Sequence, residues 1–202
     1  MRPGLNAEAQ QVLDFWFGAP GTPEHGQPRA VWFKKSAAFD ADIRARFLAL
    51  YEQAARGEKA DWAGDAHGTL ALILVLDQFP RNLFREGPDL STAARAYATD
   101  AQALALARGL VARGADRELA PLERWFAYLP FEHAETMEAQ REALRLFTQL
   151  KEEAGLAEPL VWAQKHYDVI ARFGRFPHRN GVLDRASTDA EAEFLKQPGS
   201  RF

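Results

Sequence analysis

Apolar residues recur along most of this chain at intervals of three and four, which places them on one face of an α-helix. The clearest stretch lies within residues 36–56, and its apolar positions are Ile43, Phe47, Leu50, Tyr51 and Ala54. Residues 70–76 differ, because seven consecutive apolar residues leave no polar face, and such a segment is buried on every side. This run would also suit a buried strand, but its length and the lack of a partner strand favour a helix over residues 65–79.

Capping residues, glycines and prolines set the ends of the remaining helices. We predict helices over residues 6–18, 36–56, 65–79, 93–113, 121–130, 135–154 and 159–173, and a short last one after Thr188. Thr99 and Gln102 have capping-box spacing, so the alternative for the fourth helix is a start at residue 99. Residues 19–31 and 85–91 are rich in turn formers and are predicted loops.

The helical pattern indicates one all-α domain spanning residues 1–202, because no linker separates two parts. We expect seven to eight helices packed as antiparallel pairs joined by short turns. No strict internal period is present, and the tryptophan–leucine–glycine–tyrosine pattern of tetratricopeptide repeats is absent. Any helical-repeat architecture in this chain is therefore degenerate.

Composition narrows the function classes. The chain has 25 basic and 28 acidic residues, so a nucleic-acid partner along the whole surface is disfavoured. There is no cysteine, which excludes disulfides, thiolate nucleophiles and sulfur-ligated zinc. The start lacks a signal-like apolar run, and the longest apolar run is far shorter than the ~20 residues that span a bilayer. We therefore expect a cytoplasmic protein without a membrane partner.

Three proline-containing segments carry most of the candidate chemistry. They are Gln78–Asn82, Tyr128–His133 and Arg175–Asn180, and the first and third contain nearly the same sequence motif. Proline inside a helix removes a hydrogen bond and clashes with the preceding turn, so we expect a helix to stop or kink at each segment. Polar groups at helix ends can converge without disturbing helical packing. We interpret the three segments as one site.

The first segment places Asp77 directly after an apolar run, with Arg81 and Asn82 close behind. A buried carboxylate is costly unless it is paired, and Arg81 is the nearest partner. The alternative is that Asp77 and Asn82 only satisfy backbone groups at a helix end.

The second segment offers Glu132 and His133 as an acid/base pair, followed by Glu135. Adjacent residues point in different directions on a helix, which argues against direct contact between the two. The alternative is that Glu132 or Glu135 caps the following helix and is stabilised by its dipole.

The third segment lies within residues 165–185, which are the most basic part of an acidic chain. Between residues 165 and 185 there are five Lys or Arg and two Asp. The candidate ligand contacts here are His166, Arg172, Arg175, His178 and Arg179. Arginines around a helix end can hold a phosphate or a carboxylate. The alternative is that they pair with acidic residues of the other segments and lock the fold, and His166, on an apolar face, is also typical of a hydrogen-bonded core histidine.

Metal and cofactor sites are poorly supported. His133, His166 and His178 with Glu132 would be an adequate ligand set for zinc, but no compact motif such as His-Glu-x-x-His is present. Glycine-rich phosphate loops, nucleophile elbows and dinucleotide fingerprints are absent. We predict no metal and no cofactor.

Longer motifs make the chain resemble a bacterial family catalogued as domain of unknown function 924. They lie at residues 12–18, 32–33, 76–82, 129–133 and 172–180. The resemblance covers nearly the whole chain, from about residue 10 to 202. It implies an all-helical, tetratricopeptide-like right-handed superhelix, and it implies no established activity and no functional residues.

The resulting hypothesis is a pocket that recognises a small anionic ligand, to which acid/base chemistry would be added. Its orienting residues would be Asp77 and Asn82, with Glu132 and His133 as the acid/base candidates. Anion contacts would come from Arg81, Arg172, Arg175 and Arg179. Two alternatives stay open: a non-enzymatic scaffold that binds a peptide or protein on a concave helical surface, and a purely structural charged network.

Overall fold

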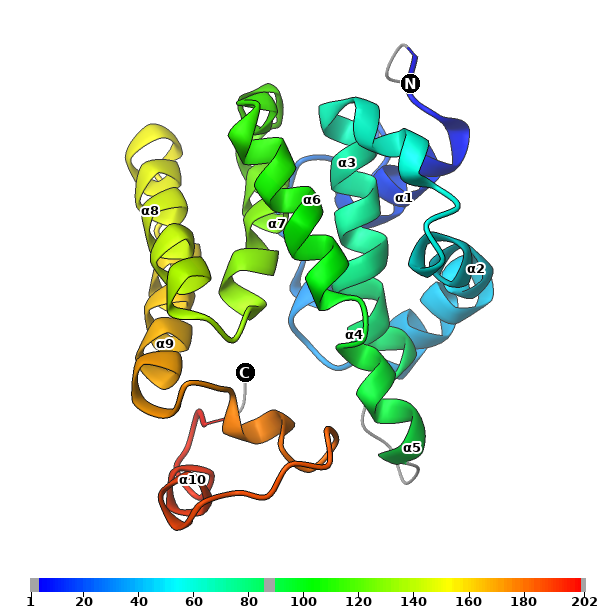
Figure 1. Ribbon diagram of the computed structural model, residues 1–202. Helices are drawn as coiled ribbons and strands as arrows, with labels where there is room; N and C mark the ends of the chain where they lie inside the picture. Colours follow the sequence, from blue (N-terminus) through cyan, green and yellow to red (C-terminus); the bar gives the residue numbers. More distant parts are fainter. Residues whose placement is uncertain (1–3, 86–89, 201–202) are drawn as a thin grey trace.

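The computed structural model describes residues 4–85 and 90–200, and all regular secondary structure in those ranges is helical (Figure 1). This confirms the all-α prediction, including the helical state of residues 70–76. The α-helices are α1 (Ala7–Phe17), α2 (Ala37–Ala55), α3 (Ala66–Ile73), α4 (Phe79–Leu83), α5 (Leu90–Ala93), α6 (Asp100–Ala112), α7 (Pro121–His133), α8 (Met137–Ala154), α9 (Glu158–Phe173) and α10 (Asp189–Phe194).

Short helical turns connect several of these elements. A π-helical turn, η3 (Leu74–Gln78), joins α3 to α4, and η6 (Pro177–Arg179) follows α9. The other turns, all of 3-10 type, are η1 (Ala30–Trp32), η2 (Ala60–Gly64), η4 (Ala94–Ala96) and η5 (Ala115–Glu118).

The α3–η3–α4 rod lies at the centre of the N-terminal part of the fold. It packs against α1, α2, α6 and α7, so its seven consecutive apolar residues are all buried. A segment apolar on every side needs neighbours on every side, and four surrounding helices supply them. The same burial reaches Asp77, which directly follows the run and is fully enclosed.

The helices α7, α8 and α9 form the other part of the fold as successive packed neighbours (Figure 1). Gly155 and Gly174 end α8 and α9 in the left-handed conformation, at φ 72° in each case. Glycine adopts this conformation without a steric penalty. After Gly174 the chain turns back, and η6 and α10 lie below the ends of α9 and α4 in Figure 1.

Two of the three prolines do not end a helix, so the expected helix stop is wrong at Pro80 and Pro130, whereas α9 does end before Pro177. Pro130 lies inside α7, which continues to His133, and Pro80 lies in the first turn of α4, which continues to Leu83. Because Pro80 has no N–H, the carbonyl of Leu76 loses its helical donor, and the hydroxyl of Thr99 donates to it at 2.5 Å. The chain therefore continues from α3 into α4 through a local π turn.

The fourth predicted helix begins later than residue 93. Leu90–Ala93 and Ala94–Ala96 form separate short turns, and the long helix α6 starts at Asp100, as the alternative start predicted. The predicted loop over 85–91 lies largely outside the described residues, and its last two residues belong to α5.

An aromatic cluster joins the two parts of the fold. Phe126 of α7 is fully buried, and its ring contacts those of Trp16, Phe17, Trp32 and Phe33 with centroid distances between 4.7 and 6.3 Å. Such pairs stabilise a fold beyond their buried area. The cluster fixes α7, whose C-terminal end carries His133, against α1.

Replacing Phe126 with alanine should lower the free energy of unfolding by about 3–5 kcal/mol, because it leaves a cavity in a packed core. Phe33 is the matched control, because it belongs to the same cluster but is 58% exposed. Phe33→Ala should cost well under half as much. Urea unfolding followed by circular dichroism measures both, and equal losses would contradict this account of the core.

Candidate functional site

Asp77 and His133 form a buried carboxylate–imidazole pair between η3 and the C-terminal end of α7. Nδ1 of His133 lies 2.8 Å from Oδ1 and 3.0 Å from Oδ2 of Asp77. A carboxylate accepts hydrogen bonds, so Nδ1 carries the hydrogen and the neutral ring keeps its lone pair on Nε2. Within the described residues no protein group forms a hydrogen bond with Nε2, and the His133 side chain is 14% exposed. The ring of His133 is therefore oriented by the hydrogen bond at Nδ1, whereas Nε2 can accept a hydrogen bond from another molecule.

Asp77 stays ionised although it is completely buried. Burial alone would raise the pKa of Asp77, but the charge of Arg81 leads the opposing effects, and hydrogen bonds from His133 and Gln78 add to it. The net result is a pKa well below the usual range for aspartate. The Gln78 amide donates to Oδ2 at 2.6 Å, and the guanidinium of Arg81 lies 3.5 Å from Oδ1 and also donates to the backbone carbonyl of Asp77.

Arg81 and Arg179 meet at Asp100, the first residue of α6. Arg81 donates two hydrogen bonds to the Asp100 carboxylate at 3.1 Å each, whereas Arg179 donates one at 3.4 Å. The Arg179 guanidinium lies over the rings of Tyr97 and Phe176, 4.7 and 4.6 Å from their centroids. Arg179 is 6% exposed, and its Nε has no hydrogen-bond partner within the described structure.

Glu132 and His166 form a second buried pair next to the first. Nδ1 of His166 lies 3.1 Å from Oε1 of Glu132 and 2.9 Å from the carbonyl oxygen of Trp162. Burial raises the pKa of Glu132 well above its ordinary value, and the charge of Asp77 adds to this effect. Burial lowers the pKa of His166 to about 3, and the charges of His133 and Arg179 act in the same direction. Glu132 therefore holds its proton to a higher pH than an ordinary glutamate does, and His166 stays uncharged.

Burial also lowers the pKa of His133, against the raising effect of the Asp77 carboxylate. His133 is therefore neutral at pH 7, with Nε2 able to accept a proton. A neutral histidine oriented by a buried aspartate is the arrangement of a general base. A raised pKa, as in Glu132, is the property of a general acid, and the buried Oε2 of Glu132 has no hydrogen-bond partner within the described structure.

Two residues outside the predicted site fix the end of α7. The amide of Gln140, fully buried on α8, donates to the carbonyls of Glu132 and Ala134 at 2.7 and 2.9 Å, which satisfies the helix end. The Glu135 carboxylate accepts two hydrogen bonds from Arg185, at 2.6 and 3.0 Å, and one from the backbone N–H of Phe176 at 2.8 Å. Glu135 thus ties the segment that carries Arg179 to the α7–α8 turn.

The structure brings together only some of the residues that the sequence singled out. The residues that converge are Asp77, Arg81, Glu132, His133, His166 and Arg179. The ring of His178 stacks near that of Phe176 at 5.7 Å, and its charge also affects the pKa of His166.

The other three predicted residues have partners of their own. Asn82 donates to Asp40 of α2 at 2.8 Å, and Arg175 makes a two-pronged ion pair with Glu191 of α10. Arg172 is exposed on α9, where its guanidinium lies over the rings of Phe173 and Phe194.

Sequence reasoning missed Asp100, Tyr97 and Gln140. Asp100 was interpreted only as part of a capping box, although the Thr99 hydroxyl points to the carbonyl of Leu76 instead. A signal for it was present, because an acidic residue at the start of a helix is a ready partner for arginine. Nothing in the local sequence distinguishes Gln140 from the other polar residues of α8.

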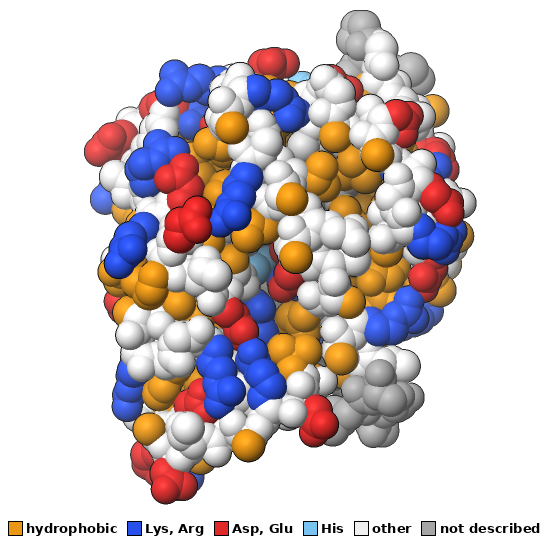
Figure 2. Space-filling model, viewed as in Figure 1, with side chains coloured by type: hydrophobic (Ala, Val, Ile, Leu, Met, Phe, Trp, Pro, Cys, Tyr) orange, Lys and Arg blue, Asp and Glu red, His pale blue; other side chains and the backbone are white. Residues whose placement is uncertain are grey.

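Solvent reaches the edge of the converging group, because the side chains of His133 and Arg81 are 14% and 22% exposed. Figure 2 shows a histidine side chain at the bottom of a depression near the middle of this face, with acidic and basic side chains just below it. Asp77 and Asp100 balance the charges of Arg81 and Arg179, so the group is close to neutral. The described residues contain no group of three or more His, Cys, Asp or Glu placed to hold a metal ion. None of the described helices has the length and apolar character that crossing a membrane requires.

Comparison with known proteins gives two matches. The model of a family described as "Bacterial protein of unknown function (DUF924)" matches residues 12–199. A solved structure of a protein of unknown function from Agrobacterium tumefaciens is 40% identical, covers 94% of this chain and 97% of its own, and superposes with a TM-score of 0.80. A search of curated proteins found no match.

Replacing Asp77 with asparagine should switch the tautomer of His133. Gln78 and Arg81 both donate towards the Asp77 side chain, so the amide group of asparagine would turn its NH₂ towards Nδ1 of His133. Nε2 would then carry the hydrogen. Long-range ¹H–¹⁵N correlation spectra of histidine side chains distinguish the two forms, with His25 as an internal reference. An unchanged His133 signal in Asp77→Asn would contradict the assigned pair.

Replacing Glu132 with glutamine should change how stability depends on pH. A raised pKa in the folded state stabilises the protein at low pH, and this contribution is lost as pH rises from ~4.3 towards the folded pKa. The variant lacks this contribution, so its free energy of unfolding should improve relative to wild type by about 1.4 kcal/mol per pH unit above pH 5. Glu138→Gln, at a side chain 82% exposed, is the control and should give a curve parallel to wild type. Parallel curves for Glu132→Gln as well would show that Glu132 is ionised.

Proposed function

The chain belongs to this family of bacterial proteins of unknown function, and we propose that the Asp77–His133 pair and Arg179 form a site that binds a small anionic molecule and moves a proton on it. His133 is the general base, Asp77 orients it, and Glu132 is the general acid. Arg179 binds the anionic group of the substrate. Arg81 and Asp100 hold Asp77 and Arg179 in place.

The observation that carries the proposal is the poorly satisfied guanidinium of Arg179. Arginine has five N–H donors, and the described residues give this one a single acceptor, Asp100, at 3.4 Å. A buried charge is costly without good partners. Burial and the nearby charge of Arg81 lower the pKa of Arg179 for the same reason. A carboxylate or phosphate group would supply the missing acceptors.

The neighbouring titratable groups support proton transfer in addition to binding. Arg179, His178 and His133 are each close enough to His166 for their charges to lower its pKa, so they surround one small region. Within that region Asp77 has a lowered pKa and Glu132 a raised one. Neighbouring carboxyl groups whose pKa values are shifted in opposite directions are typical of acid/base sites. A substrate held by Arg179 would lie beside a base and an acid.

A second candidate function is the binding of a peptide or protein. Val161 and Trp162 are 55% and 40% exposed next to each other on α9, and exposed tryptophan is enriched at interfaces. The tetratricopeptide-like superhelix belongs to this candidate, and it is supported by the packing of α7, α8 and α9 as successive neighbours. A cytoplasmic location fits either candidate, since the chain contains no cysteine.

Arg179→Gln should weaken anion binding while Arg172→Gln should leave it unchanged, because of these two arginines only Arg179 lies at the site. The probes are inorganic phosphate and malonate, and the readout is the side-chain signal of His133 titrated with each anion. Binding next to the imidazole should shift this signal and raise the pKa of His133. Loss of one charged hydrogen-bond donor weakens binding by about tenfold or more.

The dissociation constants of each anion for wild type and for the two variants are compared at a temperature where all three proteins are folded. Equal loss in Arg172→Gln and Arg179→Gln, or the absence of any His133 shift with either anion, would refute the proposed site. The peptide-binding candidate predicts that result, because in it the arginines have only a structural role.

A further inference from the structure

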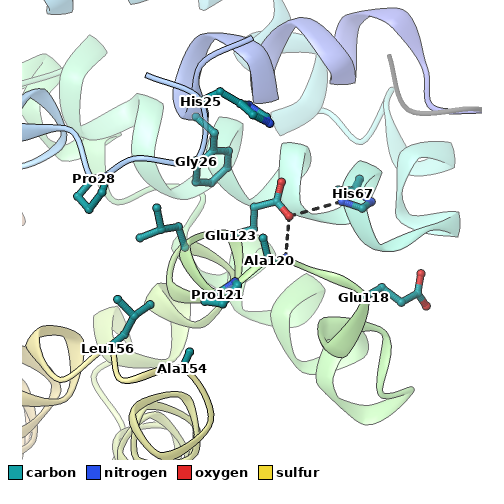
Figure 3. Close-up of a pocket in the computed structure, with 12 residues that line it drawn as sticks. His25, Gly26, Pro28, His67, Glu118, Ala120, Pro121, Glu123, Ala154 and Leu156 are labelled. Atoms are coloured by element: carbon teal, nitrogen blue, oxygen red, sulfur yellow. Dashed lines mark hydrogen bonds and ion pairs between the residues drawn. The ribbon is translucent and has the colours of Figure 1, made fainter. Parts of the chain in front are cut away.

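A cavity of about 570 Å³ lies at the N-terminal end of α7, far from the proposed anion site (Figure 3). Pro121 begins α7 and lines the cavity, whereas His133 ends the helix, and its 13 residues span about 18 Å from the first to the last. Its volume is in the range of small-molecule sites, which is roughly 300–1,000 Å³. The proposed function does not use this cavity.

The walls are largely apolar and come from parts of the chain distant in sequence. Phe17 closes α1, Leu122 lies in the first turn of α7, and Leu156 follows the end of α8. Pro28 contributes from the loop after α1. A ligand that fills this space therefore has an apolar body.

One buried carboxylate stands among these walls. Glu123 is 6% exposed, and its Oε2 accepts a hydrogen bond from the backbone N–H of Ala120 at 2.9 Å and lies 3.5 Å from Nε2 of His67. Figure 3 shows both interactions and shows the other carboxylate oxygen directed towards His25. The Ala120 bond caps α7, so the position of the carboxylate is fixed before any ligand arrives.

The charges around the cavity favour a positively charged ligand. Glu118 is the second carboxylate in the lining, and no Lys or Arg lies among the described residues that line it. Nδ1 of His25 lies 2.8 Å from the carbonyl oxygen of Gly18, so Nδ1 is the donor, and Nε2 is the acceptor in this tautomer. Glu123 and His25 thus both offer acceptors, and an anion would meet two carboxylates.

We propose that this cavity binds a primary ammonium compound with an apolar, aromatic-sized body. The ammonium group donates hydrogen bonds to the Glu123 carboxylate and to Nε2 of His25, and the body fills the space between Phe17, Leu122 and Leu156. The chain then has two sites of opposite charge preference at the two ends of α7.

The test uses 2-phenylethylamine as the probe and 2-phenylethanol as its uncharged counterpart, each titrated into the full-length protein. Amide ¹H–¹⁵N spectra report where each binds. The amine should perturb the amides of Gly26 and Ala120 and should bind at least tenfold more tightly than the alcohol. Glu123→Gln retains an acceptor for the Ala120 cap but removes the charge, so amine affinity should fall by at least tenfold.

A second variant tests the location independently of charge. Ala154 is exposed at the rim of the cavity, so Ala154→Trp should block it without touching Glu123. Ala171→Trp adds the same side chain to an exposed position of α9 and should bind the amine like wild type. Three results would each overturn the proposal. They are equal affinities for amine and alcohol, no detectable binding of the amine at concentrations up to about 10 mM, and an unchanged amine affinity in Ala154→Trp.

Discussion

The ionised carboxylate of Asp77, buried in a π-helical turn, is the constraint on which the rest of this structure depends. A charge in that position requires partners, and three different elements supply them: Gln78 in the same turn, Arg81 in α4 and His133 at the end of α7. Arg81 in turn binds Asp100, which receives Arg179 from the C-terminal segment. One buried charge thus connects the central rod, α6, α7 and η6.

The same constraint gives the histidines their chemical character. Asp77 holds the hydrogen of His133 on Nδ1, which leaves Nε2 for a substrate, and its charge helps to keep the proton on Glu132. Polar groups arranged in this way would add little to stability, because paired buried charges are often no better than apolar residues of the same volume. This is the basis of the proposed acid/base role, since neighbouring groups with opposite pKa shifts are suited to exchange protons.

The sequence predicted the fold well because helix boundaries are local. Asn6 and Thr188 cap the helices that were predicted to begin at them, and the apolar run at residues 70–76 is a buried helix. The expected helix stop was wrong at Pro80, where the Thr99 hydroxyl replaces the hydrogen bond that proline removes, and at Pro130, where α7 continues to His133. In the site, adjacent Glu132 and His133 take separate partners, as helix geometry requires. Those partners, His166 and Asp77, depend on long-range packing that no local pattern contains.

The most direct measurement is a neutron crystal structure of the deuterium-exchanged protein at pH 7, which locates the protons of the two buried pairs. The account predicts deuterium on Nδ1 but not on Nε2 of His133, none on Asp77, and one on the carboxyl group of Glu132. Deuterium on both nitrogens of His133 together with a bare Glu132 carboxylate would contradict it, because the site would then contain neither the base nor the acid.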